Sequence, residues 1–229
     1  DMQTIVESSA FYTDTTDMLA WYKFDGNCND SSGNGNDIEL FGSDMSQNDY
    51  QNIEGLSSIE FNGTSYLQIE NPGGNQLYFT PQQMTLSFWI RGATYQTYYQ
   101  SIASARSADS SGGNRRGWII YLRNGLVEIW YATISTWGNK GTTFNPTLQS
   151  NMWQHVSITF SSNSATIYVN GIYHSNYILS SSIAYGAANL RIGAGANDIE
   201  PRYFLDNGTQ LSDFRIYNRA LTLEEVKEI

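Results

Sequence analysis

Apolar and polar residues alternate with a period of two along much of the chain, which is typical of half-buried β-strands. The clearest case lies within residues 153–171, where Val156, Ile158 and Phe160 point one way and the residues between them point the other. A Ser/Asn-rich connection follows, and the alternation resumes at Thr166. This pattern predicts two antiparallel strands that are joined by a short loop and share one buried face.

A second hairpin is marked by Asn124-Gly125, the strongest two-residue turn signal, between two β-rich runs. A two-residue turn fixes the register of the strands that it joins, so it also decides which side chains share a face. The face predicted to be buried carries Trp118, Ile120, Leu122, Val127, Ile129 and Tyr131. The opposite, outward face carries Ile119, Tyr121, Arg123, Leu126, Glu128 and Trp130.

The rest of the chain has the same character, with short strands and turns rich in Gly and Asn. Further strands are predicted at 19–24, at 59–69 as a hairpin around Asn62-Gly63, and at 86–90, 190–193 and 211–217. Residues 92–117 show no period and are predicted to form a long loop. Thr222 and Glu225 form a capping-box pattern that begins a short C-terminal helix.

These elements predict an all-β protein, a two-sheet antiparallel sandwich with one short C-terminal helix. The length of 229 residues suits one such domain. Residues 1–17 are polar and are interpreted as a linker or N-terminal arm, which leaves residues 18–229 as the domain.

The net charge of the chain limits the kinds of partner that it is expected to bind. The net charge of −10 argues against nucleic acid and against an anionic membrane surface, since both require clustered Lys and Arg. It is compatible with neutral sugars, cations or basic partners. No apolar run reaches transmembrane length, so membrane insertion is not expected. Cys28 stands alone, so the fold must be stable without an internal disulfide.

Several motifs, in the same order along residues 19–229, resemble the laminin-G-like branch of the concanavalin A-like lectin/glucanase superfamily. They are LAWYKFDGN, SIEFNGTSYLQI, MTLSFWI, WQHVSITF with TIYVNG, and the closing LSDFRIYNRALTLEEV. The resemblance implies a jelly-roll sandwich of the concanavalin A type. It also implies a secreted or cell-surface protein.

Hard oxygen donors are dense after the first predicted strand, where Asp25, Asn27 and Asp30 lie close together, as Ca²⁺ requires. The resemblance implies a structural calcium that ties this loop to the closing strand at Asp213. Calcium is therefore the expected cofactor, with these four residues as candidate ligands. The alternative is that Asp, Asn and Gly serve here only as turn residues.

The outward hairpin face offers a candidate ligand site at Tyr121, Arg123, Glu128 and Trp130. Sugars bind to aromatic faces that are surrounded by polar groups, and one sheet of a sandwich can leave such a face open. Arg115 and Tyr203 lie in loops that could rim it. The alternative is that this face packs under a loop or simply meets solvent.

Catalysis is not expected. A retaining glycosidase needs two carboxylates on one face, and Glu128 has Leu126 and Trp130 as its same-face neighbours. We therefore predict a non-catalytic carbohydrate-binding domain whose partner is a glycan or polysaccharide. Two alternatives stay open, a protein-binding adhesion domain with a cell-surface protein as its partner, and a glycoside hydrolase with an atypical site.

Overall fold

The structure is a computed structural model. It describes residues 15–42, 50–53, 55–69, 83–107, 116–133, 137–142, 147–184, 188–196 and 201–229. The predicted arm at 1–17 therefore lies almost wholly outside the described residues. Within them, no helix is both long enough and apolar enough to cross a membrane.

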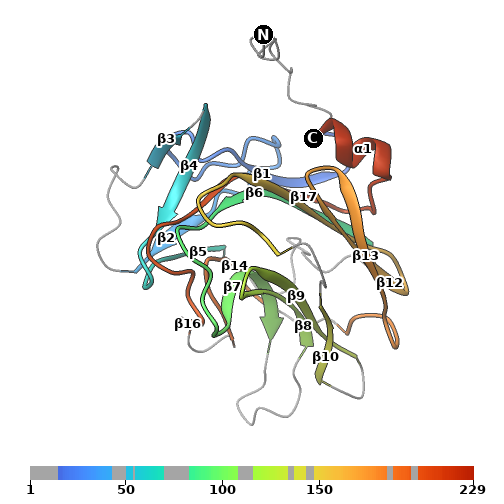
Figure 1. The fold of residues 1–229 in the computed structure, drawn as a ribbon. Coiled ribbons are helices and arrows are strands. Elements are labelled where there is room, and N and C mark those ends of the chain that lie inside the picture. The colour runs from blue at the N-terminus through green and yellow to red at the C-terminus, as the bar shows by residue number, and fades with distance from the viewer. Residues whose placement is uncertain are drawn as a thin grey trace, which may run out of the picture.

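Two antiparallel sheets are stacked face to face (Figure 1). In spatial order the eight-stranded sheet holds β13 (Ile172–Ile178), β12 (Ser164–Val169), β11 (Gln154–Phe160), β6 (Met84–Arg91), β17 (Thr209–Tyr217), β4 (Leu56–Phe61) and β3 (Tyr50–Ile53), while β1 (Met18–Tyr22) also pairs with β17. The seven-stranded sheet holds β10 (Trp137–Thr142), β9 (Leu126–Ala132), β8 (Arg116–Arg123), β7 (Gln100–Ser107), β14 (Leu190–Ile192), β5 (Tyr66–Ile69) and β2 (Glu39–Phe41). A small ladder joins β15 (Gly195–Ala196) to β16 (Pro201–Arg202). The predicted sandwich is confirmed.

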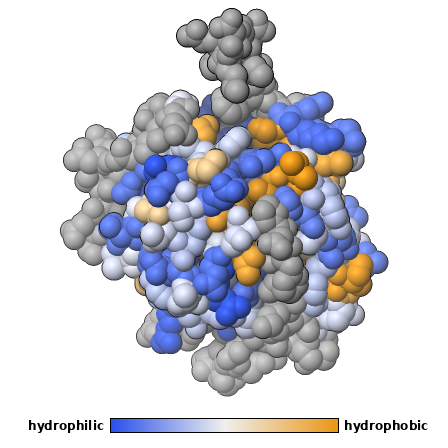
Figure 2. All heavy atoms as spheres, in the orientation of Figure 1, coloured by the Kyte–Doolittle hydropathy of each residue, from blue (hydrophilic) through white to orange (hydrophobic). Residues whose placement is uncertain are grey.

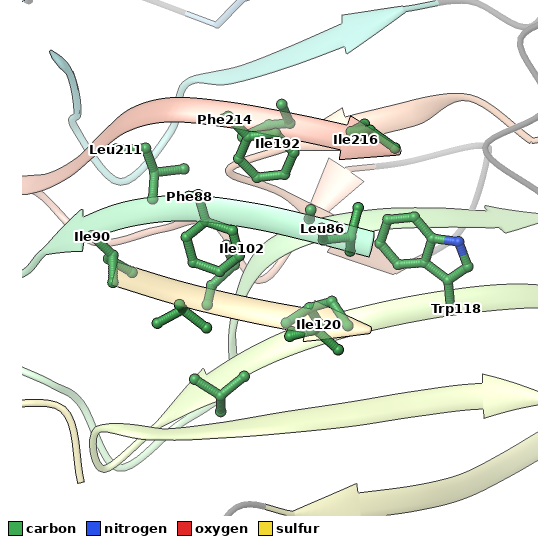
Figure 3. Close-up of a cluster of buried hydrophobic side chains, with 14 of the residues drawn as sticks. Leu86, Phe88, Ile90, Ile102, Trp118, Ile120, Ile192, Leu211, Phe214 and Ile216 are labelled. Carbon is green, nitrogen blue, oxygen red and sulfur yellow. The ribbon is translucent and has the colours of Figure 1, made fainter. Parts of the chain in front are cut away.

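The hydrophobic core fills the space between the two sheets (Figure 3). Phe88 of β6 stacks on Phe214 of β17 with ring centroids 5.3 Å apart. Trp118 and Ile120 of β8 reach the same layer from the other sheet, and both are fully buried. Alternate residues of each strand therefore meet in one core, as the period of two predicts.

Both hairpins on which the prediction rested are present. Strand β11 pairs with β12, with Val156 opposite Val169. Strand β8 pairs with β9 in the predicted register, with Tyr121 opposite Glu128. Asn124 and Gly125 have φ values of 53° and 74°, which a tight turn of this kind requires.

Two predictions about connections are wrong. The turn at Asn62-Gly63 does not close a hairpin, because β4 and β5 belong to different sheets and the turn carries the chain from one to the other. The predicted long loop at 92–117 contains strand β7, which lies between β8 and β14. Its small residues, such as Ala103 and Ala105, are buried but give no strong β signal.

The outer face of the eight-stranded sheet is partly covered by helix α1 (Leu223–Glu228) (Figure 1). Thr222 caps the helix through the predicted capping box with Glu225. Val226 packs with Trp21 and Tyr217 in a second, smaller hydrophobic cluster. The visible surface in Figure 2 is mainly hydrophilic, with separate small hydrophobic areas.

A buried polar network lies on the same outer face. His155 Nε2 and Ser87 Oγ are 2.7 Å apart, and His155 is 4% exposed. Burial, and then the nearby positive charge of Arg215, lower the pKa of His155 from 6.5 to about 4. The histidine is therefore neutral in the folded protein at neutral pH and has a structural role.

This pKa gives a pH-dependence. Below pH 6.5 the unfolded chain gains a proton at His155 that the folded protein does not accept until about pH 4. We expect the free energy of unfolding to fall across this interval, with His155 contributing up to roughly 3 kcal/mol. Urea unfolding at a series of pH values measures it.

The matched control is the other histidine, since the chain has only two. His155→Gln should flatten the pH-dependence between pH 6.5 and 4, whereas His174→Gln should leave it as in the wild type. An equal slope in all three proteins would contradict the assignment.

Candidate functional site

The candidate site lies on the outer face of the seven-stranded sheet and is built on the β8–β9 hairpin. The six side chains that the register sends inward are buried in the core: Trp118, Ile120, Leu122, Val127, Ile129 and Tyr131. The same register places Tyr121, Arg123, Glu128 and Trp130 together on the other face. Four of the six predicted ligand-binding residues thus come from two neighbouring strands.

An ion pair lies at the base of this face. Arg123 donates to Glu128 Oε1 through Nε at 2.9 Å and through Nη2 at 2.6 Å. Trp130 Nε1 donates to Glu128 Oε2 at 3.2 Å. The hydrogen bond to Glu128 raises the pKa of Arg123, so the guanidinium stays charged.

Glu128 is 0% exposed, while Arg123 is partly exposed above it. The register confirms that Glu128 lies on the predicted outward face, but other side chains cover it. A ligand on this surface meets Arg123 first. Glu128 therefore holds Arg123 and Trp130 in place from beneath.

An aromatic cluster surrounds the ion pair. Tyr99 packs against Tyr121 at 5.0 Å and edge-on against Trp130 at 5.6 Å, both between ring centroids. Tyr203 packs edge-on against Tyr121 at 5.6 Å. The guanidinium of Arg123 lies 4.5 Å from the centroid of the Tyr99 ring. We call Tyr99, Tyr121, Arg123, Trp130 and Tyr203 the aromatic platform.

The segment that carries Tyr203 crosses the outer face of the sheet. The carbonyl of Tyr203 accepts a hydrogen bond from Ser101 N of β7 at 2.6 Å. The φ of Tyr203, 54°, is unusual for a non-glycine residue. Gly195 lies close to Ile119, since a Cβ at this glycine would come within 3.5 Å of Ile119 Cγ2. Tyr203 is 46% exposed, so the platform reaches solvent through it and through the partly exposed Tyr99 and Trp130.

Two further residues bear on the predicted set of ligand-binding residues, one that was predicted and one that was not. Arg115 lies outside the described residues. Tyr99 was not among the predicted ligand-binding residues, although it contacts Tyr121, Arg123 and Trp130. Its position just before β7 could have been inferred only once that strand was recognised.

Burial raises the pKa of Tyr121 well above its usual value, and burial together with the Glu128 charge raises that of Tyr99. Both phenols therefore remain protonated at neutral pH and can donate hydrogen bonds. Because the charge of Arg123 is balanced by Glu128 beneath it, the platform and Glu128 together carry no net charge. Such a surface suits a polar but uncharged ligand with flat apolar faces.

The four predicted calcium ligands do not form one site. Asp30 accepts hydrogen bonds from the backbone N–H groups of Trp21, Ser32 and Asn36, each at 2.9 Å, and from the Ser32 hydroxyl at 2.8 Å. These donors close the loop after β1. Asp25 and Asn27 are exposed and contact each other, with Asn27 Nδ2 3.2 Å from Asp25 Oδ1.

Asp213 lies on a bulge of β17, with a φ of 49°. Its carboxylate contacts Arg215 Nη2 at 2.9 Å and accepts a hydrogen bond from Trp21 Nε1. A calcium ion at this carboxylate would have to displace a buried guanidinium. Within the described part of the chain, no three His, Cys, Asp or Glu residues are grouped to hold a metal. These residues therefore do not fit a shared calcium ion, and calcium binding stays a prediction.

A family model described as the concanavalin A-like lectin/glucanases superfamily matches residues 61–227. The chain belongs to this family. The match extends from the end of β4 through both hairpins to α1, so it includes the β8–β9 hairpin and Tyr203. No curated protein matches the sequence significantly.

Solved structures agree with this assignment at the level of fold. Domain 4 of AbnA, a GH43 extracellular arabinanase from Geobacillus stearothermophilus solved in complex with arabinotriose, is 18% identical with a TM-score of 0.67 and is matched over 92% of this chain and 97% of that one. The botulinum neurotoxin serotype G binding domain is 18% identical with a TM-score of 0.64, over 92% of this chain and 50% of that one. The binding domain of botulinum neurotoxin DC, in complex with rat synaptotagmin II, is 14% identical with a TM-score of 0.65, over 93% and 51%. This chain thus spans about half the length of the neurotoxin domains.

The contacts of Asp30 give a prediction about calcium. Asp30→Ala removes the acceptor of three backbone N–H groups, so we expect a loss of at least about 2 kcal/mol in the free energy of unfolding. The loss should be the same in calcium and in EDTA, because these contacts need no metal. Thermal or urea unfolding in both buffers measures it.

Asp25→Ala is the matched control, because among the described residues this exposed carboxylate is hydrogen-bonded only to the neighbouring Asn27 side chain. Its effect should stay within about 0.5 kcal/mol. If EDTA destabilises the wild type but not the Asp30→Ala protein, then Asp30 binds a metal and our geometric interpretation fails.

Proposed function

We propose that the chain is a non-catalytic, lectin-like carbohydrate-binding domain of a secreted or cell-surface protein, and that a neutral glycan binds on the aromatic platform. The observation that carries the proposal is the platform itself, in which partly exposed aromatic rings surround a neutralised Arg123–Glu128 pair. The solved complex of the arabinanase domain with arabinotriose supports the same kind of ligand for this fold.

The roles within the platform follow from exposure. Tyr203, Tyr99 and Trp130 offer ring surface on which the C–H face of a sugar can stack. Arg123 can donate to a hydroxyl from the N–H groups that Glu128 does not engage. Tyr121 and Glu128 are buried and act by holding the others in position.

The surroundings of Glu128 support the absence of catalysis. This carboxylate accepts hydrogen bonds from Arg123 and Trp130 and is fully buried, so both of its oxygens are engaged and neither is open to a bound glycan. Glycoside hydrolysis by a pair of carboxylates needs a second carboxyl group about 5–10 Å away, across the scissile bond. The contacts of Glu128 provide a cation and an indole instead.

A protein partner is the second candidate. The structure of the neurotoxin DC binding domain was solved in complex with rat synaptotagmin II, a protein. In this chain, the edge strand β13 exposes Ile172, Tyr173 and Ile178, whose side chains are 62%, 55% and 68% exposed. An edge strand with exposed apolar side chains is a surface on which a protein strand could add.

A glycan array screened with and without chelator identifies the ligand, and one variant tests the site. Trp130→Ala should weaken binding of the selected neutral glycan by at least about 1 kcal/mol, which is roughly fivefold in Kd, because aromatic anchors carry such energies. Titration calorimetry measures the change.

The matched control is Tyr173→Ala, which removes an exposed aromatic ring from the other sheet and should leave affinity unchanged. If the Trp130→Ala and wild-type proteins bound the selected neutral glycan with equal affinity, the aromatic platform would not be its binding site. Reducing-sugar release that disappears in Glu128→Gln would contradict the non-catalytic assignment.

A further inference from the structure

A second cluster of aromatic and cationic side chains lies on the outer face of the other sheet, where β6 ends and β11 begins. His155 is opposite Trp89, and Gln154 is opposite Ile90. The next position along places Trp153 beside Arg91, and the hydrogen bond from Asn151 N to Gly92 O at 2.7 Å keeps the two chain segments together there.

These side chains share one face because the residues between them point into the core. Phe88, Ile90 and Val156 are 0% exposed members of the main core. Trp89 and Arg91 alternate with them on β6 and therefore point outward, as Trp153 and His155 do beside β11. Helix α1 packs over Trp21 and Tyr217 in a different part of this face. We call Trp89, Arg91 and Trp153 the donor cluster.

The donor cluster has three buried N–H groups with no hydrogen-bond partner in the part of the chain that the structure describes. They are Trp89 Nε1, Arg91 Nε and Trp153 Nε1. A buried polar group without a partner destabilises a protein by about 1–3 kcal/mol, so native structures contain few of them. Three such groups at adjacent positions are donors only, and none can satisfy another.

Among the residues that the structure describes, Arg91 makes one side-chain hydrogen bond, and its partner is a neutral group. Its Nη1 donates to Gln210 Oε1 at 3.3 Å, and Gln210 Nε2 in turn donates to Glu60 Oε2 at 2.8 Å. Among the described residues, no carboxylate forms an ion pair with Arg91. The positive charge of this guanidinium is therefore not neutralised directly.

The other ionisable groups near the donor cluster bring no uncompensated charge to it. Tyr95 lies against Gly92 and near Arg91, and burial raises its pKa to about 12, so its hydroxyl stays protonated. His155 stacks against Trp89 at 5.3 Å, is bonded to Ser87 and is neutral near pH 7. Arg215 is paired with Asp213. The cluster therefore holds three buried N–H donors and one positive charge next to two partly exposed tryptophan residues.

We propose that the donor cluster is a second binding site, which takes the carboxylate of an acidic saccharide such as a hexuronate. A carboxylate has only acceptors and one negative charge, and it can accept from a guanidinium and an indole N–H at the same time. The indole rings give the sugar ring a stacking surface. That a saccharide carries the carboxylate rests on the proposed function, whereas the anion site rests on the donors alone.

The overall charge of −10 does not oppose this assignment. Long-range repulsion slows the approach of an anion and is screened by salt over about 8–10 Å. Contact with desolvated donors acts within hydrogen-bonding distance. Affinity for the acidic sugar is therefore set by the donor cluster, and its association rate should rise with salt.

The indole N–H groups themselves provide the readout. The chain has six tryptophans, so a ¹⁵N-labelled sample gives six indole signals, which Trp→Phe variants assign. A hexuronate oligosaccharide should move the Trp89 and Trp153 signals, and a neutral hexose oligosaccharide of equal length should not. Arg91→Gln should weaken hexuronate binding by at least about tenfold, because a charge-assisted hydrogen bond is lost.

Two controls match this design. Arg202→Gln makes the same charge change at an exposed residue of β16 and should change affinity less than about twofold. Trp153→Phe keeps an aromatic ring but removes one N–H group, so it should weaken binding without unfolding the protein.

Unmoved Trp89 and Trp153 signals with hexuronate, or equal movement with the neutral oligosaccharide, would overturn the proposal. If poly-glutamate bound with the same affinity as the hexuronate oligosaccharide, the proposal that a saccharide carries the bound carboxylate would be wrong. Trp130→Ala should leave hexuronate binding unchanged, so failure here is separable from failure at the aromatic platform. If the wild-type protein bound hexuronate but no neutral glycan, the result would count against the proposed function and not against the donor cluster.

Discussion

The register of the β8–β9 hairpin is the constraint on which both the core and the candidate site depend. Asn124 and Gly125 adopt the positive φ values that a two-residue turn needs, and so fix Tyr121 opposite Glu128. A slip by one residue would turn every side chain to the opposite face. Arg123 and Glu128 would then lie in the core, and Trp118 would lose its place in it.

The register also has an unfavourable consequence, which the side chains around Glu128 offset. It places a carboxylate in the middle of a sheet face that the chain later covers, and burying an isolated charge is very unfavourable. Arg123 and Trp130 supply three hydrogen bonds to Glu128, and Tyr99 covers the guanidinium. An ion pair with a buried carboxylate contributes little net stability, but removing Arg123 would leave the buried Glu128 without its cation. We infer that its value lies in fixing the rings of the aromatic platform.

The sequence predicted the parts of the fold that local patterns determine. Two hairpins, the core face of β8–β9 and the capped helix at Thr222 follow from period-two alternation, turn chemistry and capping. Strand β7 was missed because Ala103 and Ala105 are too small to give an alternating signal. The turn at Asn62-Gly63 was misinterpreted because a local signal cannot say whether the next strand joins the same sheet. The chemistry of the site needed these non-local facts, since Tyr99 and Tyr203 reach the platform from segments far apart in sequence.

Both sheets thus have an outer face with its own chemistry. The seven-stranded sheet carries the aromatic platform, and the eight-stranded sheet carries a helix, a buried histidine network and a set of unsatisfied donors. The central claim is that the platform is where a neutral glycan binds. A crystal structure of the protein with the glycan selected from the array tests it most directly. The account predicts a sugar ring stacked on Trp130 or Tyr203 with a hydroxyl bonded to Arg123, and a glycan bound elsewhere with the platform empty would contradict it.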